Sequence, residues 1–520
     1  MAMLRNFRNI ATVSLSTGAS RILGLVRDVL IYAGLGAGIW SSAFLLAFTL
    51  PNLFRRLLGE GALTSALIPI FGEVLNREGR GAAFNFFSAV TVRVLLLLSF
   101  LTAFGMLLLG AFVLSGSLNM RWSLAGELSV LLLPYMLCIC LSAVFAAGLQ
   151  VFGRFTAAAA TPVVLNLAMI IAMGGGMLLG RPPEEMIYWL CGGVLVGGVL
   201  QLFIPAIDFA RQGWRPKMSR AAEAPMRELR ALLLPALAGA AILQVNIMIS
   251  RLLAHGLNES AVSVLFLASR LMELPLGLFA ISVTTVFFPL MADSLARKDE
   301  AAFAESFSSG LRMVLGISVP AGIGLLLLGE PVVELLRFGR FEGADAKTVA
   351  GLVGVYGCGL PFYSAATFAT RGLHASKAIP CTVRVSAICL LVNLVGSLIL
   401  MHFLAERGLA LANVIAAMVQ AILLWRALAH RHNSIRLATL RSTGIKILAS
   451  TAIMAVFCQG GLLLLNTSNL AGKLHAIIAV ATLIPGGIAI YFYTLYIQGF
   501  EELSLLAGKF RKKLQSSAEH

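Results

Sequence analysis

Apolar residues follow one another in long runs along most of the chain, and short polar or charged clusters separate these runs. Runs such as Val94–Leu109 and Val314–Leu328, with their flanks, reach the roughly 20 residues that a helix needs to cross a bilayer. Membrane-spanning β-strands would instead show alternating segments of about ten residues. The pattern therefore predicts an all-α polytopic membrane protein.

Turns and charges divide the apolar runs into about fourteen predicted transmembrane helices. The predicted spans are 8–32, 39–72, 84–115, 126–150, 157–179, 186–208, 230–254, 260–293, 306–328, 347–371, 379–403, 407–428, 442–465 and 475–498. The second and the eighth are longer than one crossing requires. Pro51 and Pro275 predict a bend or a tilt in these two spans.

Composition excludes the soluble classes of protein. Of the 520 residues, 59% are hydrophobic and 12% are charged, which is about half the charged fraction of an ordinary soluble domain. The 40 Lys and Arg against 24 Asp and Glu give a net charge of +16. In a membrane protein this excess is typical of cytoplasmic loops rather than of nucleic-acid binding.

Basic residues alternate between the two sides of the membrane, as the predicted spans require. One side collects both termini and every second loop, including the cluster Arg211, Arg215, Lys217, Arg220 and Arg227. The opposite loops carry isolated basic residues and one exception, the loop 329–346 with Arg337 and Arg340. Because basic loops face the cytoplasm, both termini are predicted to be cytoplasmic.

Two similar segments indicate an internal repeat. Ala66–Phe71 and Val286–Met291 share an apolar pattern around a proline and lie 220 residues apart. The basic loop 209–228 divides the chain after six spans, so both halves start on the same side of the membrane. We predict two six-helix lobes around a central cavity, followed by two C-terminal helices. The predicted boundaries are 1–208 for the first lobe, 209–229 for a basic cytoplasmic linker, 230–428 for the second lobe, 442–498 for the last two spans and 499–520 for a basic cytoplasmic tail.

Ionised side chains inside spans indicate where the function lies, because each costs roughly 2.5–3.5 kcal/mol at mid-membrane on insertion scales. In the first span, small and polar residues recur at three- and four-residue steps along one helical face. They are Ser14, Thr17, Gly18, Arg21, Gly24 and Asp28, and Arg27 lies about 100–120° around the helix from them. Asp28 either neutralises one arginine in a structural pair or belongs to a binding site. With two arginines beside one carboxylate, a positive charge is left over.

The second span carries Arg55 and Arg56 shortly after Pro51, in otherwise apolar sequence. Glu60 follows Arg56 by one turn and can pair with it, which leaves Arg55 for a ligand. The alternative is a turn at the membrane surface whose arginines reach the lipid headgroups.

The eighth span carries Arg270 and Glu273, three residues apart, and an intrahelical ion pair is the alternative to a binding site there. Together the motifs hold five arginines and three acids, an excess of two positive charges, from Arg21, Arg27, Arg55, Arg56 and Arg270 against Asp28, Glu60 and Glu273. Guanidinium groups bind phosphate in a bidentate manner and stay charged, so the excess favours a phosphate or pyrophosphate headgroup. Arg93, Arg251 and Arg384 are left out of this sum as lone charges that can reach the interface.

The sequence contains no Walker-type loop, no dinucleotide-binding fingerprint and no paired His or Cys spacing for a metal. We therefore predict no cofactor and no metal site. The energy for transport would come from the membrane potential, an ion gradient or consumption of the product.

Three segments carry a resemblance to a known family. They are Ser20–Asp28 (SRILGLVRD), Leu50–Ala62 (LPNLFRRLLGEGA) leading to Ala66–Pro69 (ALIP), and Arg270–Gly277 (RLMELPLG). In this order they closely resemble the MurJ/MviN family, the lipid II flippases of bacterial peptidoglycan synthesis, within the superfamily that also holds multidrug and polysaccharide exporters. The similarity covers the whole chain and includes Arg154-Phe155, Pro162, Asn166 and Gly339–Phe341.

The resemblance implies a transporter and not an enzyme, with fourteen helices in two lobes around a V-shaped cavity. It implies translocation of lipid II, the undecaprenyl-pyrophosphate-linked peptidoglycan precursor, from the cytoplasmic to the periplasmic leaflet of the bacterial inner membrane by alternating access. The implied partners are lipid II, membrane lipids and other cell-wall synthesis proteins, and nucleic acid is not among them.

Site residues are also implied by the matching motifs. Arg21, Arg27, Arg55 and Arg270 correspond to cavity arginines that engage the pyrophosphate, with Asp28, Glu60, Glu273 and Asn166 as acidic or polar support. Candidate hinge residues are Gly18, Gly24, Pro51, Pro275 and Gly277. The chain departs from relatives that carry acidic residues near Ser42, near Ser250 and in place of Ser269. Because an acid near Ser250 contributes to a sodium site in some members, this serine argues against sodium coupling here.

Three other functions stay open at this point. The fold would serve equally for another undecaprenyl-linked glycan, since the diphosphate is shared. A drug/cation antiporter of the same superfamily would need unpaired acids, whereas arginines predominate here. A non-transporting scaffold would tolerate neutral replacement of an arginine together with its acidic partner.

Overall fold

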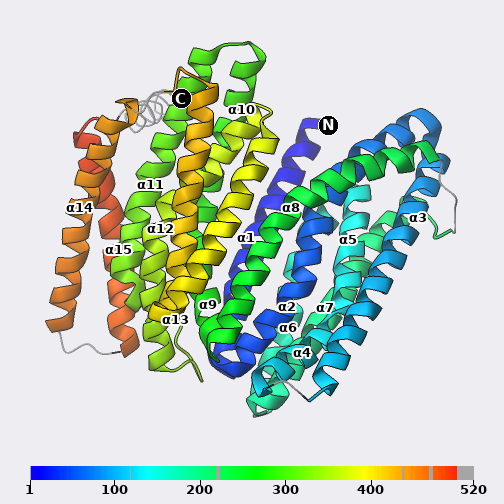
Figure 1. Cartoon of the computed structure of the whole chain (residues 1–520), viewed down its shortest axis with the longest axis horizontal. Coiled ribbons are helices and arrows are strands. Elements are labelled where there is room, and N and C mark those ends of the chain that lie inside the picture. Colours follow the sequence, from blue (N-terminus) through cyan, green and yellow to red (C-terminus); the bar gives the residue numbers. More distant parts are fainter. Residues whose placement is uncertain (1, 117–118, 218–222, 436–437, 468–471, 501–520) are drawn as a thin grey trace. The chain divides into compact units, whose positions relative to one another are not determined.

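The computed structural model describes residues 2–116, 119–217, 223–435, 438–467 and 472–500. In these ranges the regular structure is entirely helical, with fifteen α-helices and two π-helices, which confirms the predicted all-α class (Figure 1). The elements are α1 (Ala2–Leu35), α2 (Ile39–Phe54), η1 (Arg55–Ala62), α3 (Leu63–Leu114), α4 (Met120–Leu132), α5 (Pro134–Val151), α6 (Thr156–Leu178), α7 (Pro183–Ala210), α8 (Glu223–Leu257), α9 (Ala261–Pro275), η2 (Leu276–Ala280), α10 (Ile281–Ala296), α11 (Glu300–Leu335), α12 (Gly343–Ala375), α13 (Ile379–Arg431), α14 (Ala438–Thr467) and α15 (Gly472–Ile497).

The predicted spans fall on these helices, and the breaks between them have local causes. The long helices α3 and α13 each leave helical geometry at one residue, Gly79 (φ +82°) and Ala405 (φ +48°), between two predicted spans. The single predicted span 126–150 falls on α4 and α5, which separate at Pro134 because proline lacks the N–H that would continue the hydrogen-bond ladder. Within the described residues, ten helices are long and apolar enough to cross a membrane, so the number of crossings stays a prediction.

The predicted bends in the second and eighth spans coincide with π-helices. In the first half, η1 follows α2 within one turn of Pro51. In the second half, η2 begins directly after Pro275. A π-helix accommodates an additional residue within an α-helix and occurs frequently at functional sites. The two halves therefore share a backbone irregularity at corresponding places, in addition to the proline-containing hexamers.

Helix packing divides the chain into two compact units, Met1–Ser263 with Phe338–Glu342, and Val264–Arg337 with Gly343–His520. In the first unit, α6 packs against α1 and α7, α5 packs against α3 and α7, and α8 packs against η1 and α2. In the second unit, α12 packs against α11 and α13. The lobe boundaries predicted from the basic loop stay a prediction.

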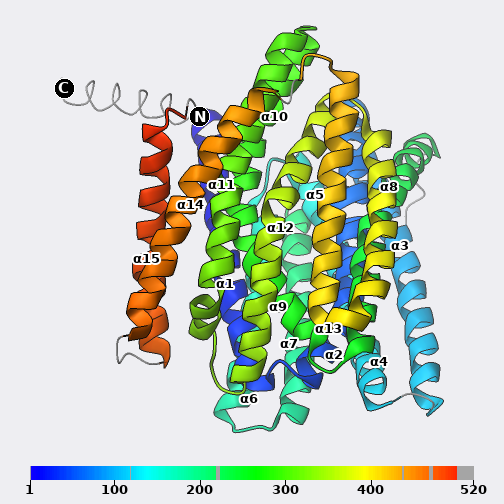
Figure 2. The same cartoon turned by 60° about the vertical axis from the view of Figure 1, so that its left-hand side comes forward.

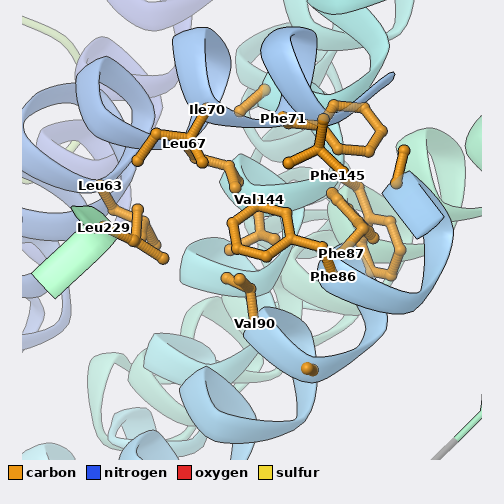
Figure 3. Packing of buried hydrophobic residues seen from close by; sticks show 14 of the residues in the cluster. Leu63, Leu67, Ile70, Phe71, Phe86, Phe87, Val90, Val144, Phe145 and Leu229 are labelled. Carbon is orange, nitrogen blue, oxygen red and sulfur yellow. The ribbon is translucent and has the colours of Figure 1, made fainter. Parts of the chain in front are cut away.

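The core of the first unit contains a cluster of aromatic rings. Phe87 and Phe209 have ring centroids 4.2 Å apart, and Phe71 lies 5.5 Å from Phe87. Figure 3 shows Phe71, Phe87 and Phe145 close together, beside the aliphatic side chains of Leu67 and Ile70. These rings join α3, α5 and α7, so the unit has an apolar core of its own.

The second unit includes the last two helices of the chain. Helices α14 and α15 pack against each other and against α11, and Figure 2 shows the two of them beside it. The hydroxyl of Tyr491 on α15 donates a hydrogen bond to the Gly316 carbonyl oxygen on α11 at 2.5 Å. Because Tyr491 is fully buried, this bond satisfies its polar end and fixes the position of α15.

A histidine ties three connections together at one end of the second unit. The side chain of His432, which follows α13, is buried and lies 2.6 Å (Nδ1) from the Glu300 carboxylate at the start of α11. Its Nε2 lies 2.8 Å from the hydroxyl of Ser376, which follows α12. The ring also contacts Phe303, with centroids 4.4 Å apart. The tie therefore holds the ends of α11, α12 and α13 at fixed positions.

We expect His432→Ala to lower the stability of the second unit. The substitution removes two hydrogen bonds, one of them to a carboxylate, and a buried ring contact, for a loss of about 2–4 kcal/mol. The measurement is thermal unfolding of the purified protein in detergent. His430→Ala is the matched control because His430 is exposed two residues earlier. Equal unfolding temperatures for the two variants would contradict the role of the tie.

Candidate functional site

The most buried charge among the predicted site residues lies on α1. The Asp28 side chain is 2% exposed, and its Oδ1 accepts hydrogen bonds from Arg27 Nη2 at 2.6 Å and Nε at 3.0 Å. The Arg27 side chain is 13% exposed. Adjacent residues point in different directions along a helix, and the long arginine side chain turns back to reach its neighbour. The acid expected to neutralise one arginine therefore pairs with Arg27.

Asn166 on α6 completes this group. Its Oδ1 accepts a hydrogen bond from Arg27 Nη1 at 2.9 Å, and its Nδ2 donates to the backbone carbonyl of Ser20 at 3.0 Å. The amide is 5% exposed and links α6 to α1 at two positions. The arginine head is thus held from two sides, by a carboxylate and by an amide oxygen, in a fixed orientation.

The other small and polar residues on this face of α1 differ in their surroundings. Gly18 and Arg21 are exposed, and a side chain added at Gly18 would meet nothing within 4 Å. Gly24 is buried, like Asp28 one turn later. This face of α1 therefore runs from an accessible section of the helix into the interior of the first unit.

Arg55 is the first residue of η1 and is half-buried. Its Nε donates to the Oδ1 of Asn52 at 3.2 Å, and the amide of Asn52 donates to the Phe48 carbonyl at 2.9 Å. Arg56 is exposed. The side chain of Glu60, its expected partner, lies outside the described part of the chain.

Two tyrosines show that three arginines share one region of the first unit. Tyr135 lies within electrostatic range of both Arg27 and Arg55, and Tyr32 lies within range of Arg27 and Arg251. Asp28 also acts on Tyr32, so this carboxylate and the three guanidinium groups lie within electrostatic range of the two tyrosines. The residues named here carry a net charge of +2, three minus one.

Arg251 on α8 is a member of this region that the sequence analysis set aside as a lone charge. Its Nη1 donates to the backbone carbonyl of Leu45 at 2.9 Å and to the hydroxyl of Thr49, both on α2. It therefore links α8 to the helix that leads into Arg55. The neighbouring polar residues Asn246 and Ser250, at helical spacing, were the available signal for a polar face on this helix.

Arg270 and Glu273 lie in the second unit, on α9. Arg270 Nη1 and Glu273 Oε2 are 3.2 Å apart, so the intrahelical pair expected at this spacing is present. The two side chains are 36% and 53% exposed. Pro275 ends α9 and Gly277 lies in η2, directly beyond the pair. The structure thus brings Arg27, Asp28 and Asn166 together in one unit and Arg270 with Glu273 in the other.

The fold is that of a membrane transporter. Over 94% of the chain, it is similar to a structure described as "Lipid II flippase MurJ, inward closed conformation", with a TM-score of 0.78, 24% identity and 98% of that chain covered. It is also similar to an inward-facing multidrug resistance transporter of the MATE family in the MOP superfamily, with a TM-score of 0.66 and 14% identity over 80% of this chain and 95% of that chain. These likenesses define the fold, a polytopic helical fold that both of those transporters share.

The sequence then gives the family. Residues 31–480 match the family described as "Lipid II flippase MurJ", and the chain belongs to this family. Proteins described as "Probable lipid II flippase MurJ" from Rhizobium meliloti (strain 1021) and Rhizobium tropici are 30% and 29% identical to it, each over 100% of this chain and 98% of the relative. The resemblance noted in the sequence is confirmed, as is the prediction of a multi-pass membrane transporter rather than an enzyme.

Proposed function

We propose that this protein translocates lipid II from the cytoplasmic to the periplasmic leaflet of the bacterial inner membrane by alternating access, with both termini in the cytoplasm. The observation that carries the proposal is a partly buried, oriented arginine within a membrane-spanning unit, in a chain of the lipid II flippase MurJ family. Membrane lipids surround the spans, and other cell-wall synthesis proteins are the natural partners of such a transporter.

Arg27 is held in a way that suits it to bind a pyrophosphate. Among the described residues, its hydrogen bonds to Asp28 and Asn166 use three N–H groups, and the remaining N–H groups of the guanidinium are available to a phosphate oxygen. Asp28 stabilises the charge of the empty site, and the amide of Asn166 sets its direction. Transfer of the headgroup out of water is costly, and an arginine that is already oriented replaces part of that hydration.

Arg55 and Arg251 extend the positive region around Arg27, and Arg21 lies at the accessible section of α1. Arg270 supplies a further guanidinium from the second unit, with Glu273 as its partner. The polyprenyl tail stays in lipid while the headgroup passes, because the tail is apolar and the arginines bind the diphosphate. In this mechanism the cations attract the headgroup, and movement of the units about the site changes the side from which it is reached.

The direction of transport requires a driving force. We propose that the membrane potential, an ion gradient or consumption of the product supplies it, because the chain has no nucleotide-binding loop, and the serines at positions 42, 250 and 269 argue against sodium as the ion. Hinge movement within the units is assigned to Gly18, Gly24, Pro51, Pro275 and Gly277.

The experiment is leaflet accessibility of lipid II in cells depleted of their own flippase that express this protein. We expect outward translocation with the natural chain, and a loss of at least about tenfold with Arg270→Ala, because one charge-assisted bond contributes about 1.5–3 kcal/mol. Arg297→Ala, at an exposed arginine that follows α10 and pairs with Asp293, is the control and keeps the wild-type rate. If the natural chain is folded and lipid II stays in the inner leaflet, the assignment of lipid II as the cargo is wrong. Other lipid-linked glycans are then tested.

A further inference from the structure

The segment Phe338–Glu342 belongs to the first compact unit, although the helices before and after it, α11 and α12, belong to the second. Four of its five residues are exposed, and Phe341 alone is buried, at 1% exposure. The segment is thus a short connection with a turn at Gly339 and Arg340, and the Phe341 ring anchors it. It contains the Gly339–Phe341 motif, which has no part in the proposed transport mechanism.

The segment contacts the end of α1 through both backbone and rings. The amide of Arg340 donates a hydrogen bond to the Ala33 carbonyl at 2.9 Å. The ring of Phe341 lies 5.6 Å from that of Tyr32, centroid to centroid. Tyr32 in turn donates a hydrogen bond to the Ser263 carbonyl at 2.7 Å, so the whole contact is buried against the start of α9.

Two glycines make the approach of the backbones possible. Gly339 has φ +56°, and a Cβ there would collide with the Ala33 carbonyl oxygen. Gly36 has φ +72°, and a Cβ there would lie 3.1 Å from the Arg340 carbonyl oxygen. Both residues adopt the left-handed conformation that favours glycine; at Gly339 the backbone of Ala33 also excludes a side chain, whereas at Gly36 a Cβ fits after a shift of a few tenths of an ångström. Both the segment and the end of α1 therefore carry a glycine that favours this contact.

We propose that Phe338–Glu342 is a strap that holds the end of α1 and is released in each transport cycle. This inference rests on the proposed function. Alternating access moves one unit relative to the other, and the strap is packed in the first unit while its flanking residues, Arg337 and Gly343, belong to the second. A segment in this position either detaches from α1 during the movement or acts as a fixed pivot.

The composition of the contact favours release over a fixed pivot. The strap consists of five residues, four of them exposed, whereas the aromatic core of the same unit joins three helices. Tyr32 follows Arg27 by five residues on α1, about 7.5 Å along the helix. Release of the strap therefore frees the section of α1 that carries the proposed headgroup site.

The test is a reversible cross-link between Gly36→Cys and Arg340→Cys. A Cβ at position 36 would lie 3.8 Å from the Cβ of Arg340, the usual separation in a disulfide. Cys358 is exposed and is replaced by serine in all variants. We expect the pair to cross-link on oxidation, lipid II translocation to fall at least tenfold, and reduction to restore it. The single-cysteine variants, treated in the same way, are the controls.

A cross-linked protein that translocates lipid II at the rate of its reduced form would show a fixed pivot and overturn the proposal. Failure of the two cysteines to cross-link would overturn it as well, because the contact would not be formed. Recovery on reduction shows that the double variant folds. If the natural chain does not translocate lipid II, the proposed function is wrong. Release of the strap is then tested by a measurement that does not depend on the cargo.

A measurement that needs no cargo is hydrogen–deuterium exchange of the backbone amide of residue 340, which donates to the Ala33 carbonyl when the strap is packed on α1. We expect exchange to be at least tenfold faster in the reduced than in the oxidised double variant. Equal rates would overturn the strap. Gly339→Ala in the natural chain should also accelerate exchange in this segment, whereas Gly180→Ala should not. Gly180 has a similar φ of +63°, and a Cβ there would meet nothing within 4 Å.

Discussion

A protein that combines Arg27→Gln with Asp28→Asn is expected to fold normally and to translocate lipid II about 10- to 100-fold more slowly than the natural chain. The double substitution removes both charges of the buried pair, so no uncompensated ion is left in the interior. Asp28→Asn keeps the size of its side chain, and Arg27→Gln, although shorter, keeps a polar amide that can hydrogen bond. The variant loses the charge-assisted bonds to the cargo, which are the source of the expected fall in rate.

The single variant Arg27→Gln gives a different result. It leaves the Asp28 carboxylate, which is 2% exposed, without its guanidinium partner. Breaking a buried ion pair from one side costs about 3–5 kcal/mol, so we expect loss of folded protein as well as of transport. The comparison of the single and double variants therefore separates the stability of the pair from its part in transport.

Both variants are measured for leaflet accessibility of lipid II at matched expression, and for thermal unfolding. A matched control is the exposed pair of Arg77 and Glu73, which is joined at 2.5 Å and is replaced by two glutamines. We expect this control to behave like the natural chain, because exposed pairs contribute about 0–1 kcal/mol. An active Arg27→Gln, Asp28→Asn variant would support the scaffold hypothesis, in which the charges only join helices.

Replacing Gly322 with leucine is expected to prevent assembly of the second unit. Gly322 on α11 and Gly357 on α12 lie opposite each other where the two helices cross. A Cβ at Gly357 would lie 2.6 Å from the Gly322 carbonyl oxygen, and a Cβ at Gly322 would collide with the Gly357 carbonyl oxygen. Because backbone atoms fill the space, no side-chain rotation can relieve the overlap. The helices have to separate, and the packing of α11 against α12 is lost.

The same helix offers a control two residues away. A Cβ at Gly324 would meet nothing within 4 Å, so Gly324→Ala should be neutral or stabilise by up to about 1 kcal/mol through helix propensity. Gly322→Ala should destabilise by about 1–3 kcal/mol, and Gly322→Leu by more. Yield of monodisperse protein and thermal unfolding in detergent measure both effects. Equal behaviour of the two alanine variants would show that the crossing is not as close as described.

Local patterns predicted the helices well because a membrane requires long apolar runs. The breaks at Gly79 and Ala405 lie between predicted spans, where charge and turn residues interrupt these runs. Pro51 and Pro275 indicated irregular backbone, and π-helices follow both. Periodicity could not predict the form of the irregularity, since a π-helix depends on tertiary packing rather than on the residues alone.

The site was less predictable because it depends on contacts distant in sequence. The pair Arg270 and Glu273 follows from spacing, and the structure contains it. Helical periodicity placed Asp28 on the face of Arg21, whereas the carboxylate binds its neighbour Arg27. Asn166 lies 139 residues from Arg27, and the family resemblance rather than any local pattern indicated it. Arg251 was set aside, because no local pattern shows that α8 faces α2.

The position of Phe338–Glu342 has a consequence for biosynthesis. The carbonyl of Ala33 receives its hydrogen bond from Arg340, which is synthesised 307 residues later (340 minus 33). At about 5–20 residues per second, the end of α1 waits roughly 15–60 s for this partner after it has been made. During that time α11 must also be inserted into the membrane. The first unit is therefore completed only after a large part of the second has been synthesised, and an N-terminal half expressed alone lacks a piece of its own structure.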